Sequence, residues 1–423
     1  MAKRFRIDTL HSGGDCRWMV GLLVSSRCTH LGATALAVTG QGLDAQLEVA
    51  GSLVVGVPRE SVSLFASLLG GVPTAPISLA VLRAQLAEVE ASLVADLLTE
   101  ASIAPGRILA VGVDDPGLWK FARGGPNCYM GLCDPARLAE LTGMNVIDAF
   151  PARDLAQGGQ GGPVAAIAQW LLLNHSKHNR VLLELGRTAR LSYLPSRSVD
   201  NAPGRVLSFD VGPGMALLDA LASRLSGGEH RFDPGGRLAV QGRRIDELME
   251  HWLSDPYFDR PLPRWHPRGV RPERFLADAL QKAVDHDWSV RDVLCTATYF
   301  VAETIATAIR RRLPPDETLD QLVVAGRGQQ NGMLLGEIGR LAELPLVSVD
   351  ELGVADEAFG SAAAAALALL HVDQIPGNHP AITNTEVSRL LGRITPGSPQ
   401  SWQRLLAMTS GRVPTVRPLR SAV

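Results

Sequence analysis

Apolar and polar positions along this chain follow two periods, and together they predict an α/β protein. Short runs rich in Val, Leu and Ala predict buried strands, whereas apolar residues recurring every three or four positions predict amphipathic helices. The predicted strands are residues 19–24, 33–38, 107–113, 144–150, 181–185 and 344–350. The predicted helices are residues 79–98, 131–143, 164–173, 287–312 and 356–370. Residues 205–221 and 322–338 each have the pattern strand, glycine-rich turn, helix.

A glycine-rich stretch, A-F-P-A-R-D-L-A-Q-G-G-Q-G-G-P, occupies Ala149 to Pro163, where the predicted strand 144–150 ends. Glycines permit positive φ, so successive backbone N–H groups can turn toward one point and form an anion-binding nest. A carboxylate beside such a nest suits phosphoryl transfer, because Asp154 can take a proton while the amides hold developing charge. The competing interpretation is an ordinary surface turn, in which Asp154 only braces the loop.

The run D-L-A-Q-G-G-Q-G-G-P, which starts at Asp154, resembles the D-V-A-A-G-G-Q-G-A-P signature of the anhydro-N-acetylmuramic acid kinases. These are sugar kinases of the actin and hexokinase superfamily, and the resemblance extends in order over residues 19–397. It implies an α/β, two-domain actin-like or hexokinase-like (ribonuclease H-like) fold with a central cleft. It also implies that Asp154 is the general base. The implied substrate-binding residues are Gly158, Gly159, Gln160, Gly161 and Asp210.

Two further stretches resemble the family's nucleotide-contacting turns. F-D-V-G-P-G, residues 209–214, is similar to the family's F-D-T-G-P-G, and the turn at 326–331 keeps two glycines and Asn331. The resemblance implies ATP and Mg²⁺ as cofactors. The implied nucleotide- or phosphate-binding residues are Gly212, Gly214, Gly326, Gly328, Ser25 and Ser26.

The chain departs from the family at three loops. Residues 24–34, V-S-S-R-C-T-H-L-G-A-T, lack both aspartates of the family's S-G-T-S-x-D-G-x-D phosphate loop. Residues 114–117, D-D-P-G, replace H-G-Q-T, and this sequence favours a turn over a metal-binding pair. The loop at residues 184–190 has two arginines where the family has N-I-G-G. No metal-ligating residue is therefore assigned, and a pseudokinase that binds a ligand or protein is the alternative to an active kinase.

Composition narrows the class of partner. The 423 residues carry 41 basic and 43 acidic side chains, so the formal net charge of -2 favours neither nucleic acid nor an anionic membrane. The five cysteines lack a C-x-x-C pair, which is typical of reduced thiols in a cytosol. With no signal peptide or membrane span evident, we expect a cytoplasmic protein whose partners are a sugar and a nucleotide, with a homodimer left open.

The expected organisation is an N-terminal domain at residues 1–203, of which 1–18 are a polar extension, and a C-terminal domain at 204–397. Residues 398–423 are expected to be a frayed tail. The expected function is an ATP-dependent phosphotransferase that opens the 1,6-anhydro bridge of the amino sugar and phosphorylates it during peptidoglycan recycling. Closure of the two domains about the polar segment 196–204 is expected to bury the ligand.

Overall fold

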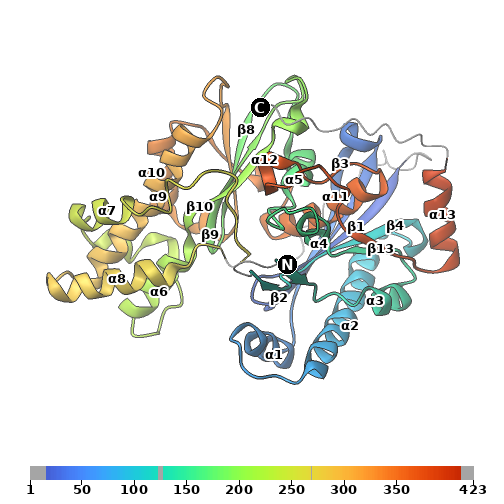
Figure 1. Ribbon diagram of the computed structural model, residues 1–423, viewed down its shortest axis with the longest axis horizontal. Helices are drawn as coiled ribbons and strands as arrows, with labels where there is room; N and C mark the ends of the chain where they lie inside the picture. The colour runs from blue at the N-terminus through green and yellow to red at the C-terminus, as the bar shows by residue number, and fades with distance from the viewer. Residues whose placement is uncertain (1–15, 122–126, 268, 411–423) are drawn as a thin grey trace. The chain divides into compact units, whose positions relative to one another are not determined.

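The computed structural model describes residues 16–121, 127–267 and 269–410, and these form two compact units (Figure 1). The second unit is Asn174–Leu352, and the first comprises the described residues before and after it. This division differs from the expected boundary at residues 203 and 204. Residues 180–194 pair within the sheet of the second unit, whereas residues 356–372 pack on the sheet of the first.

The first unit is built on a six-stranded sheet in the order β13-β7-β4-β1-β2-β3. Its strands are β1 (Arg17–Val24), β2 (His30–Thr39), β3 (Gln46–Gly56), β4 (Ile108–Asp114), β7 (Val146–Asp148) and β13 (Arg393–Thr395). The strands β1, β2 and β3 pair antiparallel, and β4 pairs parallel with both β1 and β7. A small separate hairpin is formed by β5 (Leu118–Lys120) and β6 (Cys128–Met130).

The helix α11 packs against the middle of this sheet, and small residues on both partners allow the close approach. A Cβ at Gly21 would lie 1.9 Å from the carbonyl oxygen of Ser361, and one at Gly112 would lie 2.3 Å from that of Ala364. The alanine-rich sequence of α11 is therefore explained by the distance between helix and sheet. The helices of this unit are α1 (Arg59–Leu69), α2 (Pro76–Glu100), α3 (Pro135–Thr142), α4 (Phe150–Leu155), α5 (Ala166–Leu173), α11 (Asp356–Val372), α12 (Pro380–Thr383) and α13 (Pro399–Thr409).

The second unit has a five-stranded sheet in the order β10-β9-β8-β11-β12. Its strands are β8 (Arg180–Leu185), β9 (Thr188–Leu194), β10 (Leu207–Pro213), β11 (Gln321–Ala325) and β12 (Leu346–Ser348). Its helices are α6 (Met215–Leu225), α7 (Asp246–Leu253), α8 (Pro272–Asp285), α9 (Val290–Arg312) and α10 (Gly332–Ala342). By length and composition α9 could cross a membrane, but 78% of its most apolar window is buried, which identifies it as the core helix of this unit.

The predicted strands and helices are confirmed, with shifts of a few residues at their ends. The expectation of a frayed tail after residue 398 is wrong for the part that the structure describes. Ser398 caps α13 by accepting a hydrogen bond from the Ser401 amide, and Leu405 is buried against the first unit. A capping serine followed by Pro399 is a helix-start signal. Residues 1–15 of the predicted extension and residues 411–423 lie outside the described residues.

Candidate active site

Asp154 lies on a helix and not in the glycine-rich loop itself, which corrects the sequence-based picture of an acid directly after a strand. The strand β7 ends at Asp148, and Ala149 has a left-handed φ of 55° that redirects the chain. Helix α4 then starts at Phe150, with Pro151 in its first turn where its missing N–H is not needed. Asp154 is in the last turn of α4, directly before the glycines.

The carboxylate of Asp154 is fully buried and accepts three hydrogen bonds. Its Oδ2 accepts from the backbone N–H of Gly161 at 2.7 Å. Its Oδ1 accepts from the hydroxyl of Thr383 at 2.5 Å and from the side-chain amide of Asn378. The backbone N–H of Gln160 in turn donates to the carbonyl oxygen of Thr383 at 2.7 Å, so the two segments are joined at two points.

Two glycines of the motif are required by close packing. A Cβ at Gly159 would lie 2.2 Å from Oδ2 of Asp154, and one at Gly161 would lie 2.7 Å from the ring of Trp119. Gly158 and Gly161 also have positive φ, of 77° and 82°. These contacts explain the glycines structurally, and the substrate-binding roles of Gly158, Gly159, Gln160 and Gly161 stay predictions.

Burial raises the pKa of Asp154 above its ordinary value, while the hydrogen bonds from Thr383, Asn378 and Gly161 act to lower it. A carboxylate has about four lone-pair directions. Three are occupied here, so one direction on Oδ2 is left for a proton. The carboxylate is therefore fixed by three donors and keeps one lone pair that can accept a proton. Asp154 has no solvent-exposed surface in this conformation.

The segment containing Asn378 and Thr383 was not assigned a role from the sequence. Its signal was present in P-G-N-H-P-A-I-T-N-T, residues 376–385, which is similar to the family's P-G-N-x-P-x-V-T-G-A. Both side chains are fully buried, and Asn378 also accepts from the backbone N–H of Arg389 at 2.7 Å. These residues position Asp154 from the C-terminal part of the chain.

In the D-D-P-G sequence, Asp114 is the last residue of β4, and residues 115–117 connect it to β5. Asp115 is buried, and its Oδ1 accepts from the Gly117 amide at 2.8 Å while its Oδ2 accepts from the amides of Leu132 and Cys133 at 2.9 and 3.0 Å. Burial raises the pKa of Asp115, and the backbone amides oppose that rise. Asp115 therefore holds two loops together.

Ser25 and Ser26 occupy the turn between β1 and β2. The Ser25 hydroxyl accepts from the backbone amides of Thr29 and His30, at 3.0 and 3.1 Å, and so closes the turn on itself. Ser26 is exposed. Ser25 thus has a bracing function here, and the phosphate-binding roles of both serines stay predictions.

In the second unit, the glycine-rich turns after β10 and β11 meet the turn between β8 and β9. A Cβ at Gly214 would lie 2.7 Å from the carbonyl oxygen of Gly186, and one at Gly326 or Gly328 would lie within 3.1 Å of that of Leu185. The three turns therefore converge. The backbone amides of Gly214 and Met215 donate to carbonyls of this β8–β9 turn at 3.0 and 2.9 Å. These amides are used within the protein, so the predicted nest there is not open in this conformation.

Asp210, on β10, lies in a network of buried polar groups. Its carboxylate accepts from Nε of Arg190 at 3.1 Å and from the backbone amide of His266 at 3.2 Å. Arg264 donates to the carbonyl of Asp210 at 2.8 Å and lies 4.8 Å from the ring centre of Tyr257. Burial raises the pKa of Asp210, whereas Arg190 lowers it. Asp210 thus anchors β10, and its role toward substrate stays a prediction. Gly212, two residues after Asp210, packs against Phe258: a Cβ at this position would lie 3.1 Å from the ring.

The residues present do not form a ready Mg²⁺ site. Across residues 16–121, 127–267 and 269–410, His, Cys, Asp and Glu nowhere gather in a group of three or more that could hold a metal ion. The carboxylates of Asp115, Asp154 and Asp210 each accept hydrogen bonds from donors within the protein. The five cysteines are free thiols in this structure.

Comparison with known proteins finds relatives of one family that align with most of this chain. The chain is 29% identical over 378 residues to an anhydro-N-acetylmuramic acid kinase of Acaryochloris marina, covering 89% of this chain and 99% of the relative. It is 33% identical over 320 residues to an anhydro-N-acetylmuramic acid kinase of Nitrosomonas europaea, covering 75% and 84% of the two chains. The solved structure of xylulose kinase from Rhodospirillum rubrum aligns with 93% of this chain and 98% of its own, with 12% identity and a TM-score of 0.42.

The match to the family is also continuous. The sequence profile described as anhydro-N-acetylmuramic acid kinase covers residues 20–397, from β1 to the end of β13, and so includes Asp154, its glycines and its two distant donors. That range includes all of the second unit and most of the first, and the α/β architecture of both units confirms the predicted fold class. The chain belongs to the anhydro-N-acetylmuramic acid kinase family.

Proposed function

We infer that this protein is an ATP-dependent kinase that hydrolyses the 1,6-anhydro bridge of anhydro-N-acetylmuramic acid and phosphorylates the sugar, in cytoplasmic recycling of peptidoglycan. The observation that carries this inference is the family match over residues 20–397, in which the glycine motif at Asp154 is intact. The same match speaks against the pseudokinase alternative, which rested on the rewritten phosphate loop.

In the proposed reaction, Asp154 accepts a proton from the water that attacks the anomeric carbon. The bond from that carbon to the bridging oxygen breaks, and the released oxygen attacks the terminal phosphorus of ATP. The bond between that phosphorus and the β–γ bridging oxygen breaks, and ADP leaves. Thr383, Asn378 and Gly161 keep the carboxylate oriented, while its raised pKa makes it a stronger base than an exposed aspartate. The glycine segment from Gly158 to Gly162 moves to admit the sugar.

The nucleotide is proposed to contact the converging turns of the second unit, at Gly212, Gly214, Gly326 and Gly328. The family resemblance separately proposes Ser25 and Ser26, in the first unit, as phosphate-binding residues. The support is the family motif together with the convergence of three glycine-containing turns. Since the described residues offer no preformed metal cluster, Mg²⁺ is proposed to arrive with the nucleotide, held mainly by phosphates and water.

The test is direct assay of product. Purified protein is incubated with anhydro-N-acetylmuramic acid and ATP, with MgCl2 or with EDTA, and the sugar phosphate and ADP are measured by mass spectrometry. Equal amounts of both products in MgCl2 support the inference. A folded protein that forms neither product, or that forms ADP without sugar phosphate, would refute it in favour of a binding module.

A further inference from the structure

A pocket with a volume of about 440 Å³ lies in the first unit, and Arg153, the neighbour of Asp154 on α4, is one of the residues that line it. This size is within the range of small-molecule sites, which is roughly 300–1,000 Å³. Its walls come from α4, the C-terminal end of α11, the segment 374–394 and α13. None of the residues that the family resemblance assigns to substrate or nucleotide lines it.

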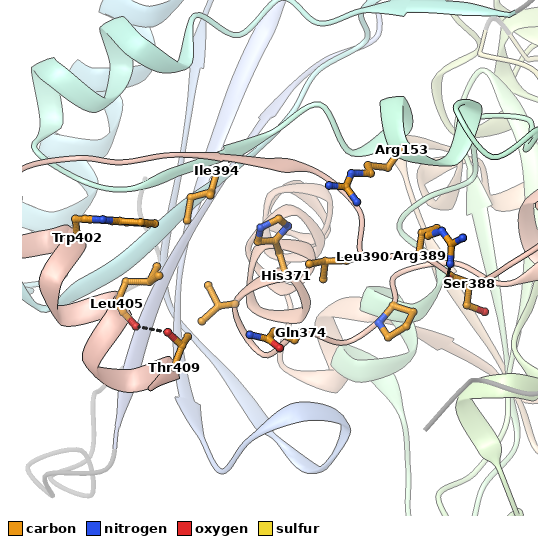
Figure 2. A pocket seen from close by; sticks show the side chains of 12 residues that line it. Arg153, His371, Gln374, Ser388, Arg389, Leu390, Ile394, Trp402, Leu405 and Thr409 are labelled. Carbon is orange, nitrogen blue, oxygen red and sulfur yellow. Dashed lines mark hydrogen bonds between the residues drawn. The ribbon is translucent and has the colours of Figure 1, made fainter. Parts of the chain in front are cut away.

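The pocket is polar at one end and apolar at the other. Figure 2 shows Arg153 and Arg389 together on one side, Trp402 and Leu405 on the opposite side, and His371 between them. No Asp or Glu is among the described residues that line it, and neither arginine forms an ion pair within the described part of the chain. Two guanidinium groups with no carboxylate beside them in the pocket can bind an anionic ligand.

His371 adds a further polar group in the middle. Its Nδ1 lies 2.7 Å from the carbonyl oxygen of Leu391, so Nδ1 carries the proton and donates it. Burial lowers the pKa of His371 below its ordinary value and the charge of Arg153 acts in the same direction, while the hydrogen bond to Leu391 opposes them, so the neutral ring is favoured near pH 7. Its Nε2 is therefore an acceptor for a hydroxyl or amide hydrogen.

The arginine end of the pocket is connected to Asp154 by a short chain of hydrogen bonds. The backbone N–H of Arg389 donates to Oδ1 of Asn378 at 2.7 Å, and the side-chain amide of Asn378 donates to Asp154. The guanidinium of Arg389 also donates to the side chain of Gln157 at 3.1 Å, at the start of the glycine segment. Arg153 is the residue next to Asp154 on α4.

We propose that this pocket is an effector site for a small organic anion, a phosphate or carboxylate attached to an apolar ring, and that its occupancy is transmitted to Asp154 through Arg389 and Asn378. The anion pairs with Arg153 and Arg389, and the ring lies against Trp402 and Leu405. Binding at Arg389 restrains the same segment that supplies two of the three donors to Asp154. The effect on catalysis rests on the proposed function. Binding of the anion, and its effect on residues 157–163 and 378–391, do not depend on that function.

The first experiment measures binding by calorimetry on the full chain, with phenyl phosphate and benzoate as probes. Inorganic phosphate and benzyl alcohol supply the anion and the ring separately. We expect one of the two ring-bearing anions to bind at one site per chain, at least about tenfold more tightly than either fragment. The better of the two identifies the anionic group. Failure of both to bind would overturn the proposal.

Variants distinguish this pocket from the active site, where a phosphate ester could also bind. Trp402→Ala and Arg153→Gln should each weaken the better probe by about tenfold or more, because one removes the ring contact and the other a charged donor. Matched controls are Gln403→Ala, an exposed neighbour on α13, and Arg59→Gln, an exposed arginine at the start of α1, which should bind as the natural protein does. Unchanged binding in Trp402→Ala would place the probe elsewhere and refute the site.

The second experiment follows the connection to Asp154 without using activity. Amide hydrogen exchange, read by mass spectrometry, should slow in peptides covering residues 157–163 and 378–391 when the probe is bound, and only in the protein with Trp402 intact. Slower exchange at 378–391 alone would overturn the transmission to Asp154. If the probe binds and slows exchange at both segments but no kinase reaction occurs, the effector site stands and the proposed function fails.

Discussion

The side-chain amide of Asn378 donates a hydrogen bond to the carboxylate of Asp154, although the two residues are 224 positions apart in the sequence. Thr383, the last residue of the short helix α12, donates to the same oxygen, Oδ1. The candidate base is therefore positioned by a segment that the chain reaches only after it has completed the second unit.

Removing one of these donors should change the pH dependence of the reaction. Thr383→Val keeps the shape of the side chain but deletes the hydroxyl, and this bond lowers the pKa of Asp154 in the natural protein. The acid limb of kcat/KM should move to higher pH, and kcat/KM should fall about tenfold for a lost charged hydrogen bond. The control is Thr385→Val, whose hydroxyl bonds only to the Val387 carbonyl among the described contacts. An acid limb that shifts equally in both variants would show that Thr383 does not act through Asp154.

Replacing the candidate base should affect turnover more than stability. Asp154→Asn cannot accept the proton, so turnover should fall by about 10²–10⁴-fold with little change in sugar affinity. The amide also cannot serve three donors, so the free energy of unfolding should drop by about 1–3 kcal/mol. Both quantities are measured on the same preparation. Normal turnover, or a stability loss without a loss of turnover at low temperature, would leave Asp154 as a brace only.

The glycine segment provides a test of close packing at the carboxylate. Gly159→Ala places a methyl group 2.2 Å from Oδ2 of Asp154, so the carboxylate or the loop must move and turnover should fall by at least about tenfold. Gly158→Ala is the matched control, since it meets no atom within 4 Å and only strains a φ of 77°, at a cost of about 1 kcal/mol in stability. Equal loss of turnover in both variants would contradict this interpretation.

Glu90 is predicted to destabilise the protein at alkaline pH. It lies on α2 with no exposed surface, and neither carboxylate oxygen has a hydrogen-bond partner among the described residues. Burial, and then the charge of Asp115, raises its pKa to about 8. The folded state therefore keeps a proton that the unfolded state loses, so stability should fall as pH rises from about 4.5 toward 8.

Glu90→Leu should remove that dependence and raise the free energy of unfolding at pH 7 by about 1–3 kcal/mol. The measurement is urea unfolding of both proteins between pH 5 and pH 9. Glu88→Ala on the same helix is the control, because Glu88 forms an exposed pair with Arg137 and should contribute less than about 1 kcal/mol. Parallel stability curves for the natural protein and Glu90→Leu would show that Glu90 is not buried in its neutral form.

The pair of Arg17 and Asp373 joins the first strand to the end of α11. Both side chains are at most 5% exposed, and Asp373 also accepts from the backbone amide of Gly42 at 2.8 Å. Asp373→Ala leaves the guanidinium buried without its charge partner and should cost about 3–5 kcal/mol in unfolding free energy. The double variant Arg17→Met with Asp373→Leu should recover most of this loss. If the double variant is no more stable than Asp373→Ala, the loss of unfolding free energy comes from the missing hydrogen bonds to backbone groups and not from an unpaired charge.

Local patterns predicted most of the secondary structure, because a strand or helix leaves its period in consecutive residues. The helix α9 with its Ser289 cap and the strand–turn–helix units at β10 and β11 are examples. The glycine motif at Asp154 also located the candidate site. The partners of Asp154 were not predicted, because hydrogen bonds across 224 positions leave no periodic signal.

The division of the chain was not predicted for a related reason. The sequence break at residues 196–204 lies within the second unit, after β9 has already paired with β8. Likewise, the alanine-rich pattern of α11 predicts a tightly packed helix but not which sheet it packs on. Only the small residues Gly21 and Gly112, distant in the sequence, specify that partner.

Because the chain returns to its first unit after completing the second, the second unit can be complete before the first during synthesis. A ribosome that has produced everything up to Leu352 has released an uninterrupted second unit, while the first still lacks α11 from its sheet and both side-chain donors to Asp154. The second unit can fold while translation continues, but the first must wait for the residues that follow Leu352. Nascent chains that stop before Asn378 would carry a complete glycine motif and an aspartate held only by the amide of Gly161, so premature termination should yield no partly active enzyme.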